Sequence, residues 1–161
     1  MSRKRQSIHG YKIKYWQGYT GGISLPTEDK HMPPNLPGFD LSGEDLSMAN
    51  FGGGNLEGAD LSYANLSGAN LAGANLRGAD LSYANLSSAF LRRANLQGAN
   101  LTGANLGFAS LESAKFTEAN LCDTNMSGAY NPSTYVDEER FRDVIWNAGT
   151  IWSEHGFRWS N

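Results

Sequence analysis

Apolar side chains recur at every fifth position through the middle of the chain. From Leu41 to Met126 this position is apolar eighteen times in succession, and fifteen of these residues are Leu. Two positions earlier, Ala stands without a break from Ala59 to Ala119. A period of five fits neither a helix, with about 3.6 residues per turn, nor a strand, with a period of about 2. The pattern therefore predicts a structure built from repeated units.

The other positions of the unit indicate how it turns. The residue between Ala and Leu is mostly Asn or Asp, and the second residue after Leu is commonly Gly. Residues two apart in extended backbone point the same way, so each unit presents Ala and Leu to one side before it turns. Four units would close a coil of about twenty residues, with the next coil about 4.8 Å further along. The Leu side chains are expected to fill the interior, and the Ala positions leave them room.

Two observations support a coil of this length. The ten residues that begin at Gly58 recur unchanged from Gly78, twenty residues later. Opposite charges also fall twenty apart, since Glu57 precedes Arg77 by that distance and Arg92 precedes Glu112. Each pair is expected to meet between adjacent coils.

The individual units resemble those of a known family. Residues 64–68 read A-N-L-S-G and residues 69–73 read A-N-L-A-G. These A-(N/D)-L-x-x units look like the pentapeptide-repeat family, and the resemblance covers roughly 90 of the 161 residues. It implies an all-β fold, a right-handed quadrilateral β-helix (β-solenoid), with the Leu and Ala positions inside.

The repeat divides the chain into three parts. Residues 1–38 form an irregular arm with basic and aromatic residues, residues 39–130 the β-helix, and residues 131–161 a C-terminal helix and tail. In the first units Phe39 and Glu44 stand where later units have Ala. Because an unpaired carboxylate is costly in an apolar interior, we expect an irregular start and regular coils from about Ala49.

The segment after the repeat has a helical pattern. Phe141, Val144, Ile145 and Ala148 recur at helical spacing, acids occupy the first turn, and Gly149 follows the last. The ends of a solenoid expose unpaired strand edges. A short amphipathic helix is therefore predicted to cap the C-terminal end. Residues 149–157 are also similar to the closing segment found after many cyanobacterial-type pentapeptide repeats.

The N-terminal arm is too poor in aliphatic residues to form a core of its own. Tyr11, Ile13 and Tyr15 alternate with lysines, which indicates one short strand in a segment that otherwise has the composition of a loop. No apolar stretch follows the basic N-terminus, as a secretory signal would require. No apolar run approaches the roughly 18 residues of a membrane helix. A cytoplasmic protein is expected, or a virion protein if a phage encodes it.

Charge is distributed unevenly along the chain, although the net charge is only −3. Residues 1–30 carry six Lys/Arg and two Asp/Glu, a net +4. Residues 31–130 carry four and nine, a net −5, and residues 131–161 carry three and five, a net −2. A basic arm thus precedes an acidic body, which bears on partners rather than on fold.

The sequence offers no constellation for catalysis, and no enzyme activity, metal or cofactor is predicted. His9, His31 and His155 lie in three separate irregular segments without a second ligand at metal spacing. Cys122 follows Ser and Thr residues in the same column of the repeat, so we interpret it as a small side chain in a Ser position rather than a reactive thiol.

One face of the predicted solenoid is a candidate binding surface. Asp40, Asp60 and Asp80 fall twenty apart and should stack, with Tyr63 and Tyr83 stacked beside them. The simpler interpretation is that Asp and Asn at this position bond nearby backbone at a turn. The functional interpretation is an acidic, aromatic face that meets a basic partner. The candidate partner-binding residues are Arg3, Lys4, Arg5, Tyr11, Tyr15, Trp16, Tyr19, Asp60, Tyr63, Asp80, Tyr83, Phe141, Ile145, Trp146, Trp152 and Trp159.

Three hypotheses follow, in this order. The first is a non-enzymatic protein–protein interaction or structural module, a solenoid with docking arms that bind a protein partner or further copies of the chain; a virion or other large assembly is one version of it. The second is a DNA mimic that modulates DNA gyrase or topoisomerase, as some members of the family do, although the charge match with DNA is poor. The third, an enzyme, is disfavoured. Nucleic acid is disfavoured as a partner, and no membrane contact is expected.

Overall fold

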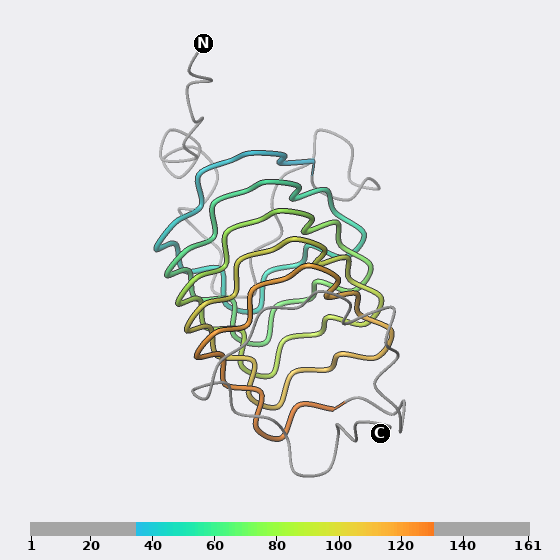
Figure 1. The fold of residues 1–161 in the computed structure, drawn as a ribbon. Helices are drawn as coiled ribbons and strands as arrows, with labels where there is room; N and C mark the ends of the chain where they lie inside the picture. The colour runs from blue at the N-terminus through green and yellow to red at the C-terminus, as the bar shows by residue number, and fades with distance from the viewer. Residues whose placement is uncertain (1–34, 131–161) are drawn as a thin grey trace.

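Between residues 35 and 130 the backbone winds into stacked coils (Figure 1). The computed structural model describes residues 35–130. In that range the backbone forms no helix and no strand longer than a single β-bridge. Sixteen parallel bridges instead join residues twenty apart, from Asn35 with Asn55 to Ser110 with Tyr130. The predicted coil of four five-residue units is therefore confirmed.

Each unit ends in a tight turn of the same kind. The carbonyl of the Leu position accepts a hydrogen bond from the N–H three residues later, as between Leu61 O and Ala64 N at 3.1 Å. The second of the two intervening residues has a positive φ in every described unit, at ten glycines and nine other residues. This combination is typical of a type II β-turn. Gly is frequent there because it adopts the left-handed conformation without steric cost.

Backbone hydrogen bonds tie each coil to its neighbours on both sides. In one unit the Asp60 N–H donates to Phe39 O of the preceding coil at 2.8 Å. The N–H groups of Leu61 and Tyr63 donate to carbonyls of the following coil at 2.7 and 2.9 Å. The same pattern recurs from unit to unit, so the backbone groups of the interior coils are paired without long strands.

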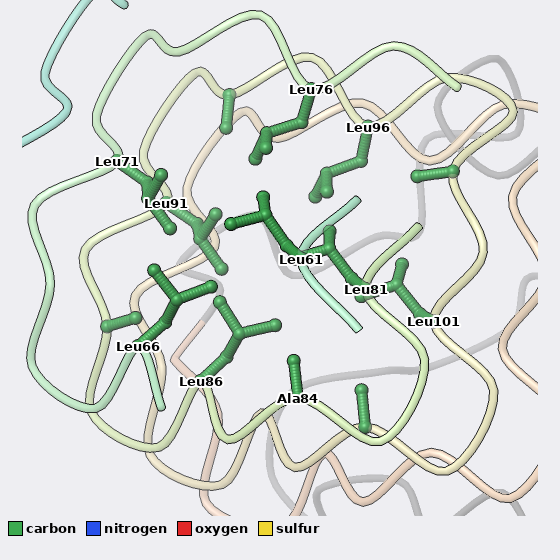
Figure 2. Close-up of a cluster of buried hydrophobic side chains, with 14 of the residues drawn as sticks. Leu61, Leu66, Leu71, Leu76, Leu81, Ala84, Leu86, Leu91, Leu96 and Leu101 are labelled. Atoms are coloured by element: carbon green, nitrogen blue, oxygen red, sulfur yellow. The ribbon is translucent and has the colours of Figure 1, made fainter. Parts of the chain in front are cut away.

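The core is a continuous column of Leu and Ala inside the coils. Figure 2 shows the Leu side chains of successive coils, such as Leu61, Leu81 and Leu101, stacked on one another. Every buried residue of this column, from Leu41 to Ala129, is at most 3% exposed. The predicted interior is thus confirmed. Each buried Leu contributes roughly 1.5–3 kcal/mol relative to an exposed one, so the column is the main source of stability.

The expectation of an irregular start before Ala49 is wrong. The first bridge already involves Asn35, and Leu41 is fully buried. Glu44 points inward, where it is only 4% exposed. Its backbone keeps the turn bond to Leu41 O at 3.2 Å and accepts from the N–H of Asn65 at 2.9 Å. Because these backbone bonds do not depend on the inward side chain, one carboxylate near the end of the core does not disrupt the coil.

One of the two predicted charge pairs forms. Arg92 Nε lies 2.7 Å from Glu112 Oε2, across adjacent coils. The other predicted pair, Glu57 with Arg77, does not form, although both residues are described. Its carboxylate instead accepts a hydrogen bond from Asn75 Nδ2, at 3.2 Å.

The predicted arm and C-terminal capping helix fall in residues 1–34 and 131–161, outside the described residues. Asn35, within the segment that the sequence assigned to the arm, already forms a regular bridge to Asn55. No helix in residues 35–130 has the length and apolar content that crossing a membrane requires.

Candidate partner-binding surface

The residue before each Leu uses its side chain to hold the turn and to join the coils. Asn85 is an example: its Oδ1 accepts from the N–H of Ser87 at 3.2 Å, and its Nδ2 donates to Asn65 Oδ1 at 3.3 Å. Repeated from coil to coil, these amide contacts form a side-chain ladder on one face. The interpretation that Asn and Asp bond nearby backbone at this position is therefore confirmed. The ladder consists of Asp45, Asn65, Asn85, Asn105 and Asn125.

The neighbouring column begins with carboxylates instead of amides. Asp40, Asp60 and Asp80 are bridged in sequence, twenty residues apart. Asp60 Oδ1 accepts from both the N–H and the Oγ of Ser62, at 3.1 and 2.6 Å, and these bonds fix the orientation of the carboxylate. Asp80 Oδ1 accepts from Asn100 Nδ2 at 3.1 Å.

This side of the solenoid is consistently acidic among the described residues. Its outward side chains include four Asp and no Lys or Arg. We call it the acidic face; it comprises Asp40, Ser42, Gly43, Asp60, Ser62, Tyr63, Asp80, Ser82, Tyr83, Asn100, Thr102, Gly103, Asn120, Cys122 and Asp123.

Two tyrosines stack at the edge of the acidic face. The ring centroids of Tyr63 and Tyr83 lie 5.1 Å apart with an angle of 13° between the planes, so the predicted stacking is confirmed. The side chains are nevertheless 67% and 55% exposed. The Tyr83 ring lies across Gly103, where a Cβ would be 2.6 Å from it. The Tyr83 ring is therefore packed between Tyr63 and the backbone at Gly103. Tyr63, at the end of the stack, is the more exposed of the two rings.

The tyrosines occupy a conformation that bulky residues rarely adopt. Their φ angles are +59° and +57°, at the turn position where most units have Gly. The left-handed conformation costs an L residue about 1–2 kcal/mol. A large, exposed side chain at such a position contributes little to folding, and strained positions of this kind concentrate at functional sites.

The structure brings together four of the predicted candidates. Asp60, Tyr63, Asp80 and Tyr83 share the acidic face, as the spacing of twenty required. The other candidates lie outside the described residues: Arg3, Lys4, Arg5, Tyr11, Tyr15, Trp16, Tyr19, Phe141, Ile145, Trp146, Trp152 and Trp159.

Residues 35–130 contain no group of three or more His, Cys, Asp or Glu side chains that could hold a metal ion. Cys122 is partly buried, and its N–H donates to Asn120 Oδ1 at 3.1 Å, as the N–H of Ser62 does to Asp60. It thus occupies the same structural position as the serines of its column. His9, His31 and His155 are not among the described residues.

Sequence reasoning missed a second aromatic surface. Phe90, Phe108 and Tyr130 are 52%, 73% and 62% exposed. Phe90 and Tyr130 lie on the side of the coil opposite the acidic face, and Phe108 lies in the turn that leads into that side. A signal for it was present in the sequence, because Phe90, Ser110 and Tyr130 fall twenty apart at a position that is Asn or Asp in most other units.

Several solved structures are similar to this chain. The crystal structure of alr5209, a pentapeptide repeat protein from Nostoc PCC 7120, is 32% identical and covers 90% of this chain and 100% of its own, with a TM-score of 0.51. HetL from Nostoc sp. strain PCC 7120, a pentapeptide repeat protein involved in heterocyst differentiation regulation, is 29% identical and covers 74% of this chain, with a TM-score of 0.45. This chain spans 59% of the length of HetL.

More distant similarity extends to QnrB1, a plasmid-mediated fluoroquinolone resistance protein. The full-length structure is 17% identical over 78% of this chain and 73% of its own, with a TM-score of 0.36. A search of curated proteins finds no match to the sequence.

The repeat itself carries the assignment of the family. The sequence profile described as Pentapeptide repeats matches eight copies, over residues 34–62, 59–98 and 89–128. The matched segments cover more than half of the chain and coincide with the stacked coils. The chain belongs to the pentapeptide-repeat family, whose members fold as right-handed quadrilateral β-helices.

Proposed function

We propose that this protein is a non-enzymatic protein–protein interaction module that binds a basic partner on its acidic face. The observation that carries the proposal is the exposed Tyr63–Tyr83 stack beside the column of Asp40, Asp60 and Asp80. Proteins of this family are generally structural or interaction proteins rather than enzymes, which is consistent with this role.

The chemistry of the acidic face favours an arginine-containing partner. A guanidinium group stacks on an aromatic ring and donates forked hydrogen bonds to a carboxylate. The exposed ring of Tyr63 supplies the first kind of contact, and Asp60 and Asp80, held by Ser62 and Asn100, supply the second. A rigid, exposed aromatic pair also loses little conformational freedom on binding, because the stack already orders its rings.

The basic segment that binds the acidic face could come from either of two sources. The basic residues of the N-terminal arm match the acidic face in charge, so the arm of a neighbouring copy is one source. A second protein is the other, and a component of a virion or other large assembly would use both kinds of contact.

The experiment is affinity capture from native lysate, read by mass spectrometry, with the full chain and with a variant that lacks residues 1–34. The deletion leaves every described residue in place. Partners lost on deletion would dock through the arm, and partners kept would dock on the coils. Failure of both proteins to retain any specific partner or a second copy would contradict the proposal.

A DNA mimic of the kind that modulates gyrase is the alternative. Acidic charge on a narrow solenoid favours it. However, the described residues carry four Lys/Arg and nine Asp/Glu, a net −5. The coils span only about 22 Å at the strand spacing, whereas duplex DNA carries one phosphate charge per ~1.7 Å. A gyrase supercoiling assay separates the two functions, because inhibition or protection at micromolar protein would place the DNA mimic first.

A further inference from the structure

The side of the coil opposite the acidic face carries its own group of exposed apolar side chains. Phe90, Phe108 and Tyr130 are all more than half exposed. Phe90 and Tyr130 lie ten residues from the Asp column of the acidic face within the twenty-residue coil, which places them on the opposite side. Phe108 lies in the turn that leads into this side, two residues before Ser110. With Arg92 and Arg93 they form what we call the aromatic–basic face.

The aromatic residues replace side chains that would have stabilised the coil. Twenty described residues, from Asn35 to Tyr130, occupy the position before Leu or its equivalent, and sixteen of them are Asn or Asp. Three of the four exceptions are Phe90, Ser110 and Tyr130, stacked in a single column. A Phe or Tyr there cannot accept the hydrogen bond that Asn85 accepts from the N–H two residues later. At Phe90 and Tyr130 the column therefore lacks the side-chain hydrogen bond to the turn and carries an exposed aromatic ring instead.

The geometry gathers these rings in one place. Ser110 is bridged to Phe90 on one side and to Tyr130 on the other. The two rings therefore flank a small side chain, about 10 Å apart at the coil spacing. The Phe108 ring lies across Gly128, where a Cβ would be 2.6 Å from it, and so reaches the coil of Tyr130.

Basic side chains border the rings. Arg92 and Arg93 lie two and three residues after Phe90, and Lys115 lies on the adjacent face. Among residues 35–130, the acids near these basic residues are Glu112, which is paired with Arg92 at 2.7 Å, and Glu118, which lies in the same unit as Lys115. An aromatic centre with a charged border is typical of a protein-binding surface. The excess of Lys and Arg over Glu favours an occupant with negative charge.

We propose that the aromatic–basic face is the docking site for residues 135–149 of the same chain. Residues 131–161 lie outside the described structure, and they begin directly after Tyr130, which is part of the face. The residue types at 131–134, Asn, Pro, Ser and Thr, favour a turn, so the chain can reverse there. Only about two coil spacings, ~10 Å, separate Tyr130 from Phe90. Eleven residues, the separation of Phe141 from Tyr130, can extend about 36 Å.

The composition of the segment matches the face. Residues 135–149 carry four Asp/Glu and two Arg, a net −2, opposite in sign to the border of the face. Phe141, Val144 and Ile145 recur at helical spacing and would supply an apolar stripe for the exposed rings. This inference is independent of the proposed function, which concerns the acidic face.

Hydrogen–deuterium exchange of the full chain tests the docking. The informative variant is the double substitution Phe90→Asn, Phe108→Gly. Both changes introduce the residue that other coils carry at the same position, so the coils should keep their fold. We expect the amides of residues 135–149 to be protected in the unmodified chain and to exchange at least about tenfold faster in the variant. The amides of residues 55–85 should be unchanged.

A matched control is the substitution Tyr63→Gly, Tyr83→Gly, which removes two rings from the opposite side. It should leave the exchange of residues 135–149 unchanged. Unprotected amides in the unmodified chain, or equal protection in the Phe90→Asn, Phe108→Gly variant, would overturn the proposal. Protection that disappears on dilution would assign the segment to a second copy, which would also overturn docking within one chain.

Discussion

At the scale of single residues, the second turn position shows which side chains folding requires and which it does not. Its φ is positive in every described unit, so Gly is the residue that folding alone would select there. Where a bulky residue takes this position, its side chain extends over the next coil. The rings of Tyr83 and Phe108 lie across Gly103 and Gly128 in this way. Large side chains at this position therefore mark surfaces, and Gly one coil later gives the rings of Tyr83 and Phe108 the room they need.

The inward and outward positions of a unit should respond very differently to a large side chain. Ala84 is 1% exposed within the Leu column (Figure 2), whereas Ser82, two residues earlier, lies outside the buried core and is partly exposed. Ala84→Trp overfills a packed interior, which typically costs 1–3 kcal/mol or more, whereas Ser82→Trp should cost much less. Thermal unfolding monitored by circular dichroism measures the difference. Equal losses of melting temperature would contradict the assignment of inside and outside.

Single residues also mark where sequence reasoning was insufficient. The inward position of Glu44 favours an irregular start, because a carboxylate is costly in an apolar interior. The backbone hydrogen bonds of its unit are nevertheless intact. Thr124 replaces Ala in the last coil in a similar way, and its Oγ1 donates to Leu101 O at 2.8 Å. The pattern of side chains predicts the coil well, but the tolerance of one polar residue depends on partners that only coordinates reveal.

At the scale of the five-residue unit, stability comes from the Leu column and from the Asn side chains that join the coils. The period of five and the spacing of twenty were sufficient to predict the core, the bridges and the Tyr63–Tyr83 stack. They could not predict the partner of Glu57, whose carboxylate accepts a hydrogen bond from Asn75 and does not pair with Arg77. Flexible surface side chains have several partners within reach, and pairs of this kind differ in energy by only a fraction of 1 kcal/mol.

The ladder residue Asn85 tests how much the amide contacts contribute. Asn85→Ala removes the bonds to Ser87, Asn65 and Asn105, and at about 0.5–1.5 kcal/mol each it should lower the free energy of unfolding by about 1.5–4.5 kcal/mol. Asn85→Asp keeps an acceptor for the N–H of Ser87 and the amide of Asn105, so it should lose less. Urea denaturation of the two variants gives the comparison. A larger loss for Asp than for Ala would contradict the role of the acceptor.

At the scale of the whole molecule, the solenoid is modular in steps of five residues. Deletion of residues 69–73 removes one complete unit, so Leu and Ala still fill every inward position of the shortened chain. The stability of a repeat protein is approximately a sum over its units, and the loss should be a few kcal/mol at most, about that of one Leu and its hydrogen bonds. Tyr63 and Tyr83 would then be fifteen residues apart, and their stack should be lost.

Deletion of residues 70–72 is the matched control. It removes fewer atoms but shifts the period, so the inward and outward positions of all later units no longer coincide with those of the earlier coils. Thermal unfolding of both variants should show cooperative melting after the five-residue deletion and a much lower melting temperature after the three-residue one. Similar behaviour of the two variants would contradict the modular account.

The family and the fold follow from the sequence because the repeat specifies the same local conformation in every unit. The partner does not follow in the same way, because a binding surface depends on a few exposed residues that the fold does not require. The second aromatic surface was missed for that reason, since its signal was the replacement of Asn after Asn70 in one column rather than a motif.

The most direct test of the central claim is the affinity of the captured partner for three forms of the full chain. These are the unmodified protein, the Tyr63→Gly, Tyr83→Gly variant and the Phe108→Gly variant, compared by titration calorimetry. Both substitutions introduce the residue that the turn favours, so the fold should be retained. We expect an affinity loss of about tenfold or more for the first variant and none for the second. Equal affinity of all three forms would show that the partner does not bind the acidic face.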